Sequence, residues 1–220
     1  MGLFCFGKVS GDAERLVYQC DIDQWARESL IAHIWSRDSI NIRQLRIWIL
    51  DAQLHKDDLV FLIAAVNPNI STQIQYALAC LPLSASTPAT KFSWFCVLKF
   101  ATTVSEEDCQ PNCSFILNGS SAYIYSDKWI LCVPSNEPLE EPDRLEVRLP
   151  NERILGAGVF NQRPVFFSTR HGVLVLNPST GDNQSYFEES VLEHSVLVDN
   201  MDTTQVYYIV ISYSFDLNRI

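Results

Sequence analysis

Positive charge is scarce in this chain of 220 residues, which has 16 Lys and Arg against 26 Asp and Glu and a formal net charge of -10. Proteins that bind a nucleic-acid backbone neutralise its phosphates with clustered Lys and Arg. The sequence has no such cluster, so we expect no direct nucleic-acid partner.

Long apolar segments are also missing. The longest uninterrupted apolar run is Leu59–Val66, whereas a helix needs roughly 18–20 apolar residues to cross a bilayer. The N-terminal stretch MGLFCFGKVSG has neither the basic start nor the long apolar segment of a secretion signal. The sequence therefore predicts neither a spanning helix nor a secretion signal.

The seven cysteines are odd in number and irregularly spaced. A chain of this length needs no disulfide staples, so a reduced, intracellular setting fits best. Cys109 and Cys113 stand four apart in CQPNC, but a zinc site needs four ligands and no second Cys or His pair has useful spacing. We interpret both as ordinary thiols and expect no metal and no cofactor.

Recognisable catalytic motifs are absent: nothing matches a nucleophile elbow, a Walker loop or a zinc-protease helix. His55, with Asp57 and Asp58 beside it in HKDD, invites a metal or acid–base interpretation. A solvated hairpin turn explains the same residues more simply. We expect no catalytic residue and no enzyme, although a site assembled from distant residues needs no linear motif.

Two glycines, Gly156 and Gly158, lie in the stretch RILGAGVFNQRPVFFSTRHGVLVLNPS. A dinucleotide-binding loop needs a third glycine three residues later and a helix after it. Asn161 holds that place, and β-branched and aromatic runs follow instead of a helix. We interpret the glycines as strand residues that permit a close backbone approach or a bulge.

One amphipathic helix is predicted over about residues 21–36. Asp21 can cap it, with Gln24 at the third position of a box-like start. Apolar residues then recur at helical spacing. The charges beside them are mixed in sign, so packing on a sheet is favoured over binding a membrane surface.

The rest of the chain reads as short strands in groups of four, over about residues 42–100, 114–149 and 154–187. The last strand of the third group is weak and lies near Gln184–Phe187. The stretches AYIYSDKWILCVPS and VFFSTRHGVLVLNPS share a strand, a polar turn opening with Ser, a second strand and a closing Pro-Ser. A period of about 40 residues predicts propeller blades. A β-sandwich would lack the four-by-four grouping.

A family resemblance rests on several of these stretches together. DIDQWARESLIAHIWSRDSINIRQLRIWILDAQLHKDDLVFLIAAVN, QIQYALACL, SAYIYSDKWILCVPS and RILGAGVFNQRPVFFSTRHGVLVL resemble the later blades of the N-terminal propeller of the 133/155-type nucleoporin family. The similarity runs from about Leu16 to Glu189.

The resemblance implies an all-β partial propeller of about three to four blades over residues 1–190, with the helix inserted. It also implies a non-enzymatic scaffold component of the nuclear pore complex, at the nuclear envelope, supporting transport of mRNA and protein. The implied partners are other nucleoporins of the Y-shaped subcomplex. The family's membrane contact at the nuclear envelope lies in a loop that we cannot match here, so we carry it to no residue. Partner-binding residues stay unknown.

The pattern departs from the family at its ends. The earlier blades and the helical half have no counterpart, which suggests a fragment, a truncated isoform or an incomplete gene model. We expect an open arc of blades to be poorly stable alone. Two other functions stay open: a generic intracellular propeller that binds proteins, and, ranked third, an enzyme or sugar-binding propeller.

Residues 191–220 form a predicted linker and an unmatched apolar tail. Val206–Phe215 combines high β propensity with no charge, Pro or Gly. It can add as a strand to an exposed blade edge, or stay unpaired and promote self-association. We favour the second fate, and so expect deletion after Asn200 to raise solubility.

Overall fold

The computed structural model describes residues 2–9, 13–35, 44–56, 58–83, 89–103, 111–134, 142–176 and 208–209, with the backbone alone for 2–20 and 208–209. The chain forms two compact units. They comprise Met1–Asn112 with Pro138–Pro142, and Cys113–Glu137 with Asp143–Ile220.

Unit 1 begins with an antiparallel hairpin of β1 (Gly2–Val9) and β2 (Ala13–Asp21), whose register shifts between Cys5 and Phe6. Strand β2 contains the stretch RLVYQC, in which Val17 and Tyr18 are residue types enriched in strands. The sequence analysis did not predict β1.

Helix α1 (Ile22–His33) follows β2 directly. The Asp21 carboxylate accepts a hydrogen bond from the Gln24 backbone N at 3.2 Å, which confirms the predicted N-cap. The Gln24 side chain donates to Glu28 Oε1 at 2.9 Å, so it points along the helix. Of the two bonds of a capping box, the one from the Gln24 backbone to the Asp21 side chain is therefore the one observed. The helix ends where Ile34 N donates to Leu30 O at 2.8 Å.

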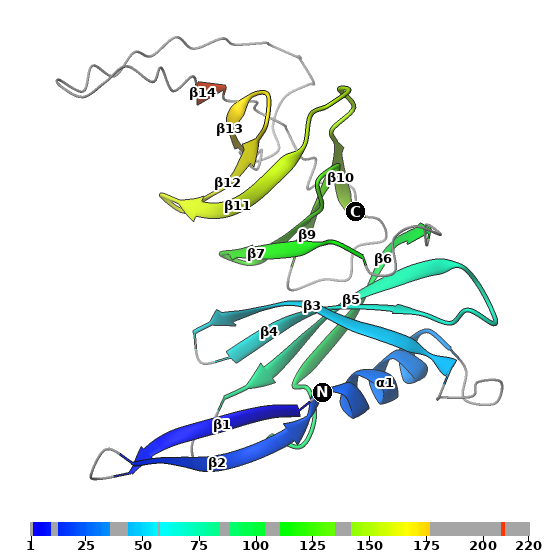
Figure 1. The fold of residues 1–220 in the computed structure, drawn as a ribbon, viewed down its shortest axis with the longest axis vertical. Helices are drawn as coiled ribbons and strands as arrows, with labels where there is room; N and C mark the ends of the chain where they lie inside the picture. Colours follow the sequence, from blue (N-terminus) through cyan, green and yellow to red (C-terminus); the bar gives the residue numbers. More distant parts are fainter. Residues whose placement is uncertain are drawn as a thin grey trace. The chain divides into compact units, whose positions relative to one another are not determined.

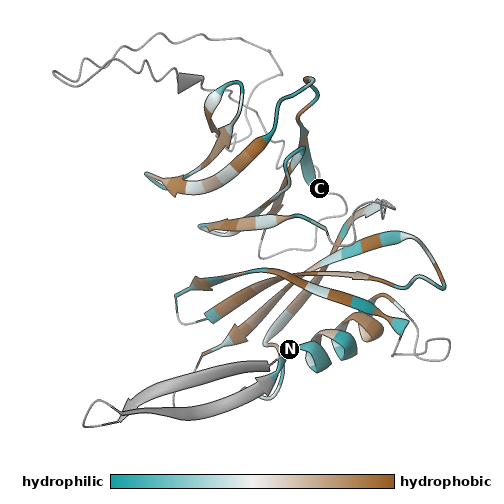
Figure 2. Cartoon of the chain, in the orientation of Figure 1, coloured by the Kyte–Doolittle hydropathy of each residue, from teal (hydrophilic) through white to brown (hydrophobic). Residues whose placement is uncertain are grey.

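The remainder of unit 1 is a four-stranded antiparallel meander, which corresponds to the first predicted blade (Figure 1). Its strands are β3 (Arg46–His55), β4 (Asp58–Val66), β5 (Gln73–Pro82) and β6 (Trp94–Thr103). Figure 2 shows hydrophobic residues along these strands and both hydropathy classes on α1.

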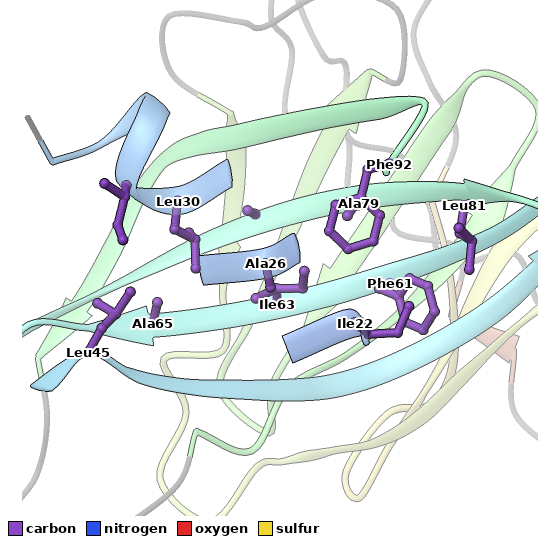
Figure 3. Packing of buried hydrophobic residues seen from close by; sticks show 12 residues of the cluster. Ile22, Ala26, Leu30, Leu45, Phe61, Ile63, Ala65, Ala79, Leu81 and Phe92 are labelled. Atoms are coloured by element: carbon purple, nitrogen blue, oxygen red, sulfur yellow. The ribbon is translucent and has the colours of Figure 1, made fainter. Parts of the chain in front are cut away.

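The core of unit 1 forms where α1 covers one face of this sheet (Figure 3). Ile22, Ala26 and Leu30 recur every fourth residue and are at most 2% exposed, because this spacing puts them in one stripe of the helix. They pack against alternate residues of the two central strands, namely Phe61, Ile63, Ala65, Ala77, Ala79 and Leu81. Packing of the helix on a sheet, the favoured prediction, is confirmed.

Unit 2 contains two four-stranded sheets, ordered β10-β9-β8-β7 and β11-β12-β13-β14. The strands are β7 (Ser114–Asn118), β8 (Ser121–Tyr125), β9 (Trp129–Pro134), β10 (Asp143–Glu146), β11 (Ile154–Phe160), β12 (Arg163–Ser168), β13 (Gly172–Val175) and β14 (Tyr208–Ile209). With the sheet of unit 1, this confirms an all-β fold of propeller type, and the first two predicted groups of four strands each form one sheet.

The two sheets of unit 2 share one apolar core. Ile116, Tyr123 and Ile130 come from the first sheet, while Phe166 and Leu174 come from the second. The ring of the fully buried Phe166 meets Tyr123 edge-on with centroids 6.4 Å apart. Blade-like sheets therefore pack face to face within this unit.

Strand β14 corrects one expectation. Its two residues pair in parallel with Val173 and Leu174 of β13, so at Tyr208–Ile209 the tail adds to a blade edge instead of staying unpaired. The predicted last strand near Gln184–Phe187 lies outside the described residues. The fourth place of the third sheet is held by β14.

Candidate functional site

A polar cluster joins the entry to β11 and the turn between β12 and β13. The Ser168 hydroxyl donates to Glu152 Oε1 at 2.6 Å, and His171 Nε2 lies 3.4 Å from the same oxygen. Glu152 and Ser168 are each 5% exposed. A buried carboxylate needs such partners, because an unpaired one loses several kcal/mol of solvation.

The cluster also holds backbone from other turns in place. Lys128 Nζ, from the turn between β8 and β9, donates to the Glu152 carbonyl at 2.6 Å. Arg170 N and His171 N both donate to Ser168 Oγ at 3.3 Å. These bonds link the second and third blades at one end of unit 2.

Ser, His and a carboxylate in contact suggest a nucleophilic triad, but the order of contacts is different. In a triad the histidine stands between the serine and the acid and takes the serine proton. Here Ser168 donates directly to Glu152, which lies between the other two. The arrangement therefore lacks the contact order of a triad, and its hydrogen bonds fix turns.

The sequence pattern indicated the two serines that open the turns, but not the contacts of this cluster. The repeated polar turn that opens with Ser corresponds to Ser126 and Ser168, both buried. Ser126 Oγ accepts from Lys128 N at 3.1 Å, just as Ser168 Oγ accepts from two backbone amides. Glu152 carried no local signal, because its partners lie 16 or more positions away.

The predicted hairpin turn at HKDD is confirmed. His55 pairs with Asp58 at the end of β3 and β4. Lys56 has a φ of 56°, as tight two-residue hairpin turns require. Among the residues that the structure describes, no group of three His, Cys, Asp or Glu could hold a metal ion.

Glycines 156 and 158 lie in β11, which is followed by a hairpin to β12 and not by a helix. The register shifts between Ile154 and Gly156, which confirms the bulge interpretation. Among the residues that the structure describes, none comes within 4 Å of a Cβ added at either glycine, so these residues show no close backbone approach. Asn161, the place of the missing third glycine, has a φ of 49° and forms the turn.

Three of the described thiols are unreactive in character. Cys80, Cys96 and Cys132 form no disulfide, and Cys109 lies outside the described residues. Burial raises the pKa of Cys132 to about 11 and also raises the pKa of Cys80 and Cys96. Because the thiolate is the nucleophile and the metal ligand, these cysteines are poor candidates for either role at neutral pH.

A shallow pocket of about 260 Å³ lies beside α1, where Trp25 and His33 face Phe92 and Phe95 near the start of β6. Its aromatic rings contact one another: Trp25 and Phe92 centroids are 5.9 Å apart, and Phe92 and Phe95 centroids are 6.0 Å apart. The rings therefore form packed walls and not an open cage for a cation.

These features define a class of protein: a partial β-propeller of antiparallel four-stranded blades, whose buried polar groups connect turns. Within the described residues, no helix is long and apolar enough to cross a membrane.

Comparison with known proteins gives a particular relative. The chain is 28% identical over 180 residues to the Nuclear pore complex protein Nup133 of Drosophila melanogaster, a match that covers 79% of this chain and 15% of that protein. The fold is similar to the Nup133 β-propeller domain of Vanderwaltozyma polyspora, with a TM-score of 0.57 and 14% identity over 78% of this chain and 48% of that one. No protein-family profile matches the chain. The sequence similarity confirms the resemblance to Nup133-type nucleoporins, and the structural similarity confirms the partial propeller fold.

Proposed function

We propose that the chain is a non-enzymatic scaffold component of the nuclear pore complex. It binds other nucleoporins of the Y-shaped subcomplex at the nuclear envelope and so supports nucleocytoplasmic transport of mRNA and protein. The observation that carries the proposal is the similarity to Nup133 along 79% of the chain. That similarity spans only 15% of the relative, so it supports a propeller portion of such a scaffold.

The chemistry of the described residues agrees with a structural role. The clustered polar groups Glu152, Ser168 and His171 bind one another and backbone atoms. Catalysis requires groups whose polar atoms stay available to a substrate. We therefore place an enzyme or sugar-binding propeller third.

A generic intracellular propeller that binds proteins is the main alternative, because the fold alone supports it equally. The two functions differ in location and in partners. The test is to tag the gene product fluorescently at its own locus and to image it beside a nucleoporin marker. We expect a nuclear rim that coincides with the marker, and co-purification of other nucleoporins.

Two matched variants show whether the described blades contribute. Phe166→Asp places a charge in the core of unit 2, where Phe166 is fully buried. Phe160→Asp makes the same change at a side chain that is 69% exposed. We expect the first variant to lose the rim signal and the second to keep it. Diffuse signal from the unmodified protein would contradict the pore function and favour the generic module.

A further inference from the structure

Exposed apolar side chains gather on the third sheet. In unit 1, the exposed side chains of Leu54 and Ile70 lie in separate elements, at the end of β3 and in the turn after β4. Single exposed apolar residues of this kind are normal at a protein surface, whereas a group of them marks a contact surface. Unit 2 contains five of the seven exposed large apolar side chains of the described residues, on or just before β11 and β12: Leu149, Leu155, Val159, Phe160 and Phe167.

The strand register puts the two exposed phenylalanines on one face of this sheet. Phe166 and Leu174 pair across β12 and β13 and face the core, so their neighbours along each strand face the other side. Residues directly across strands share a face. The rows of this second face, which we call the outer face, are Gly156–Phe167–Val173, Gly158–Val165–Val175 and Phe160–Arg163.

The corresponding faces of the other two sheets are buried. Leu62 of β4 lies on the face opposite to α1 and is 0% exposed, and Ile124 of β8 lies opposite the core face of its sheet and is also 0% exposed. On the outer face of the third sheet, Phe160 is 69% exposed and Phe167 is 48% exposed. The outer face therefore has the composition of a packed sheet face without the burial.

The shape of the outer face is complementary to itself. No described residue lies within 4 Å of a Cβ added at Gly156 or Gly158, so there is space over both glycines. The same face carries the two large rings of Phe160 and Phe167. A two-fold axis places the same patch on both sides of a contact. Each copy can then put its rings over the glycines of the other, as large and small residues interdigitate between packed sheets.

We propose that two copies of this chain associate through the outer face, with the rings of Phe160 and Phe167 in each copy packed over Gly156 and Gly158 of the other. The contact continues the packing already present in unit 2, where the opposite face of the third sheet packs on the sheet of β7–β10. A contact of this symmetry closes at two copies. It joins copies of the chain and is separate from recruitment to the nuclear rim, so it does not depend on the proposed function.

Sedimentation velocity of the full chain over a range of concentrations tests the proposal. We expect a reversible equilibrium between monomer and dimer. Phe160→Asp and Phe167→Asp should each raise the dissociation constant by about tenfold or more, because they put a charge into the centre of an apolar contact. Leu54→Asp is the matched control: it makes the same kind of change at a side chain that is 66% exposed in unit 1, and should leave the constant unchanged.

Gly158→Leu tests the fit itself, because it fills the space over the glycines and adds no charge. It should also raise the dissociation constant. Unchanged amide protection of β12, which contains the buried Phe166, shows that each variant keeps its fold. A chain that stays monomeric, one that assembles beyond two copies, or equal constants for Phe160→Asp and Leu54→Asp would overturn the proposal. A Gly158→Leu dimer as tight as the unmodified one would overturn the packing of rings over glycines.

Discussion

The buried contact between Ser168 and Glu152 makes a quantitative prediction about unit 2. In Ser168→Ala, the Glu152 carboxylate loses a hydrogen bond of 2.6 Å while its side chain is only 6% exposed. Water has little access to replace the lost donor. Two backbone amides, at Arg170 and His171, also lose the oxygen to which they donate at 3.3 Å.

Hydrogen bonds to charged groups contribute about 1.5–3 kcal/mol. The two longer bonds add less, because they face a turn that water can reach. We expect the free energy of unfolding of unit 2 to fall by about 2 kcal/mol, which corresponds to a loss of roughly thirtyfold in amide protection. Hydrogen exchange at β12, which contains the fully buried Phe166, measures it.

Thr169→Val is the matched control. The Thr169 hydroxyl accepts from Arg153 N at 3.0 Å but is exposed, so water can replace it and we expect a loss below about 0.5 kcal/mol. A double-mutant cycle of Ser168→Ala with Glu152→Gln should show coupling of about 0.5 kcal/mol or more. Equal effects of Ser168→Ala and Thr169→Val, or no coupling, would refute the reasoning.

Three further predictions concern the core, a turn and a thiol. Leu30→Ala, at a fully buried site of α1, should lower the stability of unit 1 by about 2–5 kcal/mol in urea unfolding. Ala32→Ser, at an exposed site of the same helix, should cost well under about 1 kcal/mol. Similar costs for the two substitutions would contradict the packing. Gly119→Ala should lower the stability by about 1 kcal/mol in thermal unfolding, because its φ is +61°. Gly158→Ala, where the described residues leave space for the added Cβ, should be neutral or stabilising. The reverse order of stabilities would contradict the turn conformation at Gly119. Burial raises the pKa of Cys132 from 9.0 to about 11, so the folded state keeps a proton that the unfolded chain releases. Stability should hold below pH 9 and then fall toward pH 11, with Cys132 contributing up to about 1.4 kcal/mol per pH unit, and Cys132→Ala should remove this contribution.

Local signals predicted the parts of the fold that local chemistry determines. The cap at Asp21 and the apolar spacing of Ile22, Ala26 and Leu30 located the helix, because both act within a few residues. Turn chemistry located the hairpin at His55 for the same reason. The predicted end of the helix was three residues too long, since the peptide of Ile34 already closes the last turn.

Contacts between distant residues were not predictable from these signals. Glu152 was not singled out from the sequence, because nothing near it in the chain showed that Ser168 and His171 would reach it. Addition of the tail to a blade edge was the less favoured of its two predicted fates for a similar reason, since the partner of β14 is more distant still along the chain. The bulge interpretation of Gly156 was confirmed, because a bulge needs only local backbone freedom. A close approach needs a distant neighbour, and the described residues place none within 4 Å of an added Cβ.

The chemistry of unit 2 determines which experiments separate the candidate functions. Several of its ionisable or polar groups are committed to internal contacts or kept neutral by burial: Ser168 and His171 bind Glu152, and burial raises the pKa of Tyr123 and of Cys132. Groups in these states stabilise turns and sheets, but they present no reactive atom to a substrate at neutral pH. A scaffold acts instead through where it assembles and with which partners. Localisation and co-purification therefore discriminate between the pore scaffold and the generic module, because both functions predict the same negative result in an activity screen.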